Sequence, residues 1–244
     1  MISPEVIAEQ VIGYTVGAID MIPTLTPPHH PHTIAILPQG PHFYTWLLWA
    51  AGYLLLDGSK KKLLIISEQQ HNTDNILIDT HDYGVICGKQ RKQSSEDVWK
   101  IAKDLKAKSI DANQTNILED ISVQLPFMSI IADIQQIVHI GIGSAISPLA
   151  KKRILDRVQK HSDEYNIVAL TNIDLPKQEK NSKTNEQERL TKLIMRDKKN
   201  NIIVELFQKI SKMCKQEPEI VAYIHPKELG KSASLTTRYV CAVG

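Results

Sequence analysis

The sequence has few of the features that mark secreted, membrane or disulfide-rich proteins. Its three cysteines, Cys87, Cys214 and Cys241, are scattered and form no Cys-x-x-Cys pair, which is typical of buried thiols in a reducing compartment. The longest apolar stretch, residues 43–56, is shorter than the roughly 20 residues that a membrane-spanning helix needs. No basic segment followed by an apolar one opens the sequence. We therefore expect a cytoplasmic protein without a membrane partner.

The sequence also lacks a block of charge of one sign. The 29 basic and 27 acidic residues are interleaved and give a formal net charge of +2, and the one tight basic run covers residues 60–62. Nucleic-acid-binding domains usually concentrate Lys and Arg on one surface. We therefore expect no nucleic-acid partner.

Four apolar runs are present, and each of them ends in a short polar cluster. They cover residues 33–40, 62–72, 166–174 and 219–226. Continuous runs rich in β-branched residues are typical of buried parallel strands. Open α/β sheets bind ligands beyond the carboxyl ends of such strands. The sequence therefore predicts a site among these polar tails.

The pattern between the runs predicts an alternation of strands and helices. We expect helices near residues 4–20, 43–56, 95–107, 117–131, 147–161 and 202–214. Strands are expected at 33–38, 62–67, 137–142 and 167–173, and a hairpin region at 76–88. A last strand at 236–243 is expected to lie at an edge of the sheet or to pair antiparallel. Trp46, Trp49 and Tyr53, at helical spacing, are expected in the core. These elements predict one α/β domain over residues 1–244, with a central mostly parallel sheet flanked by helices and a polar, exposed insert at residues 176–201.

Several segments resemble the Memo family. Residues 38–45, Pro-Gln-Gly-Pro-His-Phe-Tyr-Thr, and the following Ala-Ala-Gly-Tyr resemble the family's Pro-His-Ala-Gly-Tyr-x-Tyr-Ser turn and the start of its next helix. Residues 120–128, Asp-Ile-Ser-Val-Gln-Leu-Pro-Phe-Met, are similar to its His-Ser-Leu-Glu-Val-Gln-Leu-Pro-Phe-Leu element. Residues 66–71, 172–175 and 236–242 match further elements in the same order. The resemblance implies a domain akin to class III extradiol dioxygenases, with three His and one Cys around a redox-active metal.

The residues at the positions of the family's metal ligands differ from that pattern. The ligand positions fall on Gln39, Gln70, Lys177 and Ala222, and Glu119 and Ser122 replace the His and Glu of the Val-Gln-Leu-Pro-Phe element. Iron, copper and zinc favour imidazole, thiolate and carboxylate, whereas an amide is a weak ligand and a lysine cation offers no lone pair. We therefore expect a vestigial pocket without a cofactor. Further candidates for this pocket are His42, His71, Asn172 and Asp174.

Two functions are compatible with this pattern. The first is a Memo-like pseudoenzyme without the metal site, acting as a non-catalytic binding or interaction protein. The resemblance implies AMMECR1-like and radical-SAM proteins or a peptide as partners. The alternative is a metal-dependent oxidoreductase that holds non-haem iron or copper through relocated ligands, His42, His71 and either Glu119 or Asp174. These groups would have to meet within about 4 Å of one point.

A hydrolase is not expected from the sequence. It contains no Gly-x-Ser-x-Gly elbow, and no ordered set of Ser, Asp and His can be recognised in it. Asp79, His81 and Asp82 offer acid, base or ligand groups, although a turn rich in Asp and His needs no catalysis to explain it.

Overall fold

The computed structural model describes residues 4–21, 31–39, 42–69, 74–80, 93–94, 97–110, 121, 123–174, 185–196, 201–224 and 237–244. The helices are α1 (Pro4–Met21), α2 (His42–Leu55), α3 (Val98–Leu105), α5 (Leu125–Ile130), α6 (Pro148–His161), α7 (Glu186–Arg196) and α8 (Ile202–Met213). The strands are β1 (Ile34–Leu37), β2 (Lys62–Gln69), β3 (Ile76–Asp79), β4 (Gln93–Ser94), β5 (Lys108–Ser109), β6 (Gln136–Gly143), β7 (Tyr165–Leu170), β8 (Ile173–Asp174), β9 (Glu219–Ile224) and β10 (Thr237–Val243). None of the described helices combines the length and the apolar character that crossing a bilayer requires.

The strands form one mixed sheet around a parallel centre. Their order is β5-β3-β6-β2-β7-β1-β10-β8, with β4 paired to β6 and β9 paired to β10. The four central strands, β6, β2, β7 and β1, run parallel to one another. On either side of them, β3 pairs antiparallel with β6, and β10 pairs antiparallel with β1. The predicted α/β domain with a central parallel sheet is thus confirmed.

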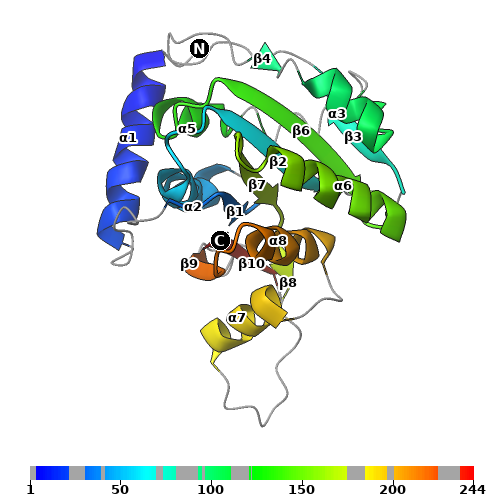
Figure 1. Cartoon of the computed structure of the whole chain (residues 1–244). Helices are drawn as coiled ribbons and strands as arrows, with labels where there is room; N and C mark the ends of the chain where they lie inside the picture. Colours follow the sequence, from blue (N-terminus) through cyan, green and yellow to red (C-terminus); the bar gives the residue numbers. More distant parts are fainter. Residues whose placement is uncertain are drawn as a thin grey trace.

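Helices cover both faces of the sheet, which explains why its central strands are apolar at consecutive positions. Ile34 and Ile36 of β1 face α3, α6, α7 and α8, whereas Ala35 and Leu37 face α1, α2 and α5. Figure 1 shows the two groups of helices on opposite sides of the sheet. We call these the α8 face and the α2 face.

The apolar run at residues 219–226 was expected to form a buried parallel strand, and this expectation is wrong. Within the described part of the chain β9 pairs with β10 alone, and this pairing is antiparallel. Its residues are half-buried or exposed. The reason is that β10 occupies the place beside β1, so that β9 has a partner on one side only. The predicted antiparallel pairing of the last strand is confirmed, but β10 lies between β1 and β9 rather than at the edge.

Trp46, Trp49 and Tyr53 of α2 pack in or against the core, as expected from their spacing. Trp49 and Tyr53 are both 1 % exposed, and Trp46 is half-buried. The Trp49 Nε1–H donates to the backbone oxygen of Pro38 at 2.9 Å. Because Pro38 directly follows β1, this hydrogen bond fixes the end of that strand against α2.

Candidate site at the carboxyl ends of the central strands

The chain leaves the neighbouring strands β1 and β7 in opposite directions. After β1 it continues into α2, which covers the α2 face, and after β7 it continues towards α7 and α8 on the other face. In α/β proteins, such a reversal at the carboxyl ends of two neighbouring strands marks the place where ligands bind. The predicted site residues Gln39 and Asn172 follow these two strands.

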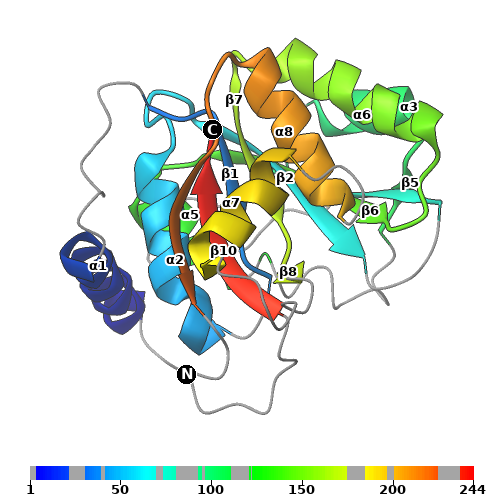
Figure 2. The same cartoon turned by 90° about the horizontal axis from the view of Figure 1, so that it is seen from below.

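The segment after β7 crosses over the end of β1. The backbone N–H of Thr171 donates to the oxygen of Leu37 at 3.0 Å, and β8 then pairs with the first residues of β10, beside which it lies in Figure 2. Within this crossing, the side-chain oxygen of Asn172 accepts a hydrogen bond of 3.0 Å from the Gln39 N–H. The structure therefore brings the half-buried residues Gln39 and Asn172 together.

A second group of polar side chains joins β2, β7 and the start of α8. The Asn201 Nδ2 group donates to the Thr171 hydroxyl at 2.8 Å, and Glu68 Oε2 lies 3.4 Å from both of these donors. The Asn201 oxygen accepts the backbone N–H groups of Ile203 and Val204, at 2.8 and 3.2 Å. Asn201 is thus the N-cap of α8 and also binds the strand ends, so that it fixes the helix relative to the site.

We expect Asn201→Ala to lower the free energy of unfolding by about 1 to 2 kcal/mol, because it removes an N-cap together with the contact to Thr171. Urea unfolding followed by circular dichroism measures this loss. The matched control is Asn185→Ala, since the Asn185 oxygen accepts the Glu188 N–H at 2.8 Å at the exposed start of α7. A loss at Asn201 no larger than the control's would show that the strand-end contact contributes nothing.

Three buried polar residues that the sequence analysis did not connect meet on the α2 face. Ser67 of β2, His139 of β6 and Asp79 of β3 are 2 %, 0 % and 2 % exposed. Ser67 Oγ lies 2.8 Å from His139 Nε2, and Asp79 lies opposite His139 in the antiparallel register. The sequence analysis did not recognise this group, because its members lie far apart in the chain. The signal that points to it is a polar residue at an inward position of otherwise apolar strands.

This trio does not have the geometry of a hydrolase nucleophile. Ser67 lies within a regular strand and is almost fully buried, whereas a nucleophile elbow presents its hydroxyl at a sharp, exposed turn. Burial lowers the pKa of His139 to about 4, against the opposite effect of the negative charge of Asp79. At pH 7 the imidazole is neutral, and it can both donate and accept a hydrogen bond.

The structure places the other predicted site residues as follows. Ala222 pairs with Cys241 of β10, so two strand spacings, about 10 Å, separate it from β1. The backbone of His42 starts α2, and that of Asp174 ends β8. The described part of the chain does not include the side chains of these two residues. It also does not include Gln70, His71, Glu119, Ser122, Lys177, His81 and Asp82. The metal site with relocated ligands therefore stays a prediction.

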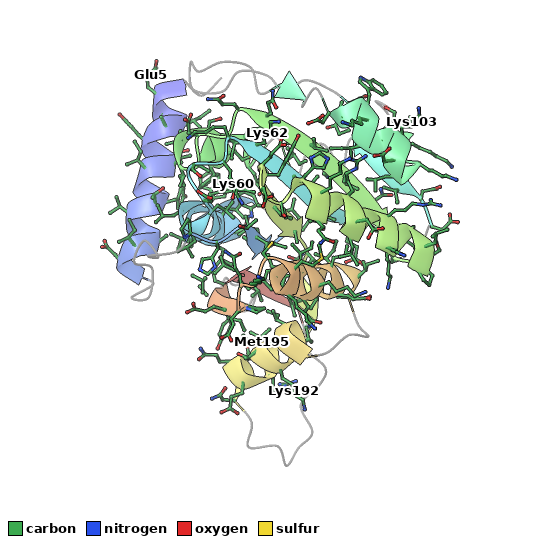
Figure 3. All side chains as sticks on the ribbon, in the orientation of Figure 1. Glu5, Lys60, Lys62, Lys103, Lys192 and Met195 are labelled. Carbon is green, nitrogen blue, oxygen red and sulfur yellow. The ribbon has the colours of Figure 1, made fainter. Side chains whose placement is uncertain are left out.

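One group with the composition of a metal site lies at the opposite end of the strands. Ligand atoms of Asp97, His161 and Glu164 are within 4.8 Å of one another. Lys62 Nζ, labelled in Figure 3, lies 3.0 Å from Glu164 and 3.8 Å from Asp97, and Arg157 Nη1 lies 3.0 Å from His161 Nε2.

This group is better explained as an ion-pair network. The lysine cation already lies between the two carboxylates. The arginine can only donate, so His161 Nε2 accepts and the ring proton is on Nδ1, which leaves no free lone pair for a metal. Burial, followed by the charge of Arg157, lowers the pKa of His161, which keeps the ring neutral in this role.

Comparison with known proteins gave no match of the chain to any family model or to any curated protein.

Proposed function

We propose that this chain is a binding protein whose ligand site lies at the carboxyl ends of β1, β2 and β7 and holds no transition metal. The observation that supports it best is the hydrogen bond between Gln39 and Asn172 at the point where the chain reverses direction. It joins the backbone N–H of Gln39 to the side-chain oxygen of Asn172, so two residues with neutral amide side chains lie together at the strand ends, where α/β proteins bind their ligands. Amides donate and accept hydrogen bonds at the same time, which suits the recognition of a polar organic ligand.

The chemistry of the neighbouring residues supports the absence of a transition metal. The Gln39 amide nitrogen lies 3.5 Å from the backbone oxygen of Glu68, and the Glu68 carboxylate accepts hydrogen bonds from Thr171 and Asn201. Transition-metal sites in proteins use three or four imidazole, thiolate or carboxylate ligands, and the amides and hydroxyl groups here are poor substitutes.

The resemblance to the Memo family extends this proposal to the protein's role. It supports a Memo-like, non-catalytic protein of the cytoplasm, with a peptide, an AMMECR1-like protein or a radical-SAM protein as partner.

Metal loading tests the proposal. Protein purified without a His-tag is incubated anaerobically with Fe²⁺ or Cu²⁺, freed of unbound metal by gel filtration and analysed by mass spectrometry. We expect less than about 0.1 metal ion per chain, because amide ligands bind these ions weakly.

The variants His42→Ala and His71→Ala control this experiment. One tightly bound ion per chain that both variants lose would contradict the proposal and favour the alternative, a metal site with His42 and His71 as ligands. An ion that both variants retain would contradict the proposal as well, since it would place a metal at other ligands.

A further inference from the structure

Gln69, the last residue of β2, carries a buried amide nitrogen that no described residue binds. The residue is 7 % exposed, and its Nε2 has no hydrogen-bond partner in this part of the chain. Its side chain lies over Gly141 of β6, where a Cβ atom would come within 2.5 Å of Nε2. The glycine therefore provides the space that the amide occupies on the α2 face.

His139 has a second unused nitrogen on the same face. Its Nε2 is bound to Ser67, whereas Nδ1 has no partner among the described residues although the side chain is fully buried. His139 precedes Gly141 by two residues, a distance of about 7 Å along a strand. A second buried nitrogen without a partner among the described residues therefore lies on the same face, two residues along β6 from Gly141.

We propose that Gln69 Nε2 binds the carbonyl oxygen of a neutral ligand such as an amide. A donor without an acceptor selects an oxygen that accepts hydrogen bonds. A carboxylate or phosphate ligand would be repelled by Asp79, which lies on the same face. This inference rests on the proposed function, because it names the class of ligand for a binding protein.

An unpaired buried donor is costly, which is the reason to assign it a role. Burial removes its hydrogen bonds to water, and without a replacement the folded state is destabilised. Gln124 shows the ordinary solution, since it is 1 % exposed and its side-chain oxygen accepts the Tyr53 hydroxyl at 2.9 Å. A buried donor that stays unpaired in the free protein, despite the loss of stability, is typical of residues retained for binding.

The first experiment compares the thermal stability of two glutamine variants in the full chain. Gln69→Met removes an unpaired amide, so we expect the melting temperature to rise by about 2 to 4 °C. Gln124→Met removes a paired amide and should lower it by a similar amount. If Gln69→Met lowers the melting temperature as Gln124→Met does, the Gln69 amide already has a partner and the proposal is wrong.

The second experiment follows the side-chain amide of Gln69 by NMR, with its signals assigned by their disappearance in Gln69→Met. The probes are acetamide, acetate and methylammonium. We expect acetamide to shift these signals, and to bind at least tenfold more weakly to Gly141→Ala, in which the new methyl group displaces the amide. If acetate or methylammonium shifts the signals instead, the site selects a charged ligand. If no probe shifts them, the site holds water only. Each of these results overturns the proposal.

The two proposals fail in different ways. A stoichiometric metal at the strand ends would overturn the proposed function and would leave the acetamide result at Gln69 in force. Conversely, a protein without metal whose Gln39 and Asn172 amide signals respond to acetamide, while those of Gln69 do not, would retain the proposed function and remove this inference.

Discussion

Trp49→Ala is expected to lower the free energy of unfolding by about 3 to 5 kcal/mol, the usual cost of removing a large buried aromatic side chain. The indole of Trp49 is 1 % exposed, and its ring meets that of Phe127 edge to face at 5.8 Å. The variant also leaves the Pro38 oxygen without its N–H donor. Urea unfolding, monitored by circular dichroism, measures the loss.

Trp99→Ala is the matched control, because Trp99 is 64 % exposed and its replacement should cost less than about 0.5 kcal/mol. The intermediate variant Trp49→Phe keeps most of the ring but not the N–H group, so we expect a loss of about 1 to 3 kcal/mol. A loss below about 1 kcal/mol for Trp49→Ala would contradict the position of this side chain between α2, α5 and the end of β1.

Acidification is expected to remove about 3 kcal/mol of stability through His139, because burial lowers its pKa from 6.5 to about 4 in the folded chain. Above pH 6.5 the imidazole is neutral in both states and has no effect. As the pH falls from 6.5 to 4, the unfolded chain takes up a proton that the folded chain does not, so unfolding becomes easier. Below pH 4 both states are protonated, and the contribution levels off.

The comparison of the native chain with His139→Gln isolates this effect, since burial also lowers the pKa values of His32 and His161. We expect the stability of the native chain to fall more steeply than that of the variant between pH 6.5 and 4. Urea unfolding at several pH values gives both curves. Parallel curves would show that His139 is protonated with an ordinary pKa.

The central strands were predictable because both faces of the sheet are buried. The runs around Leu64, Val138 and Val168 are apolar at consecutive positions, and each forms a parallel strand close to its expected limits. The run around Ala222 has the same composition, yet it forms a half-buried strand beside β10. Composition reports whether a segment can be buried, but the number of neighbours depends on which distant strand takes each place in the sheet.

The same limit explains which site residues were found. Gln39 and Asn172 were predicted to share a site, because each directly follows an apolar run. Gln69, His139 and Asp79 were not connected, since they lie within strands, and their meeting depends on the register between β2, β6 and β3. A register cannot be read from one strand at a time.

The pairing of β10 with β1 also sets the order in which the nascent chain can complete its sheet. Ala35 can pair with Val243 only after about 200 further residues have been synthesised. A ribosome that adds roughly 5 to 20 residues per second needs some 10 to 40 s to make them. During this time one edge of β1 offers open backbone groups to any other extended chain. The topology therefore leaves β1 open to pairing with other extended chains until β10 has been made.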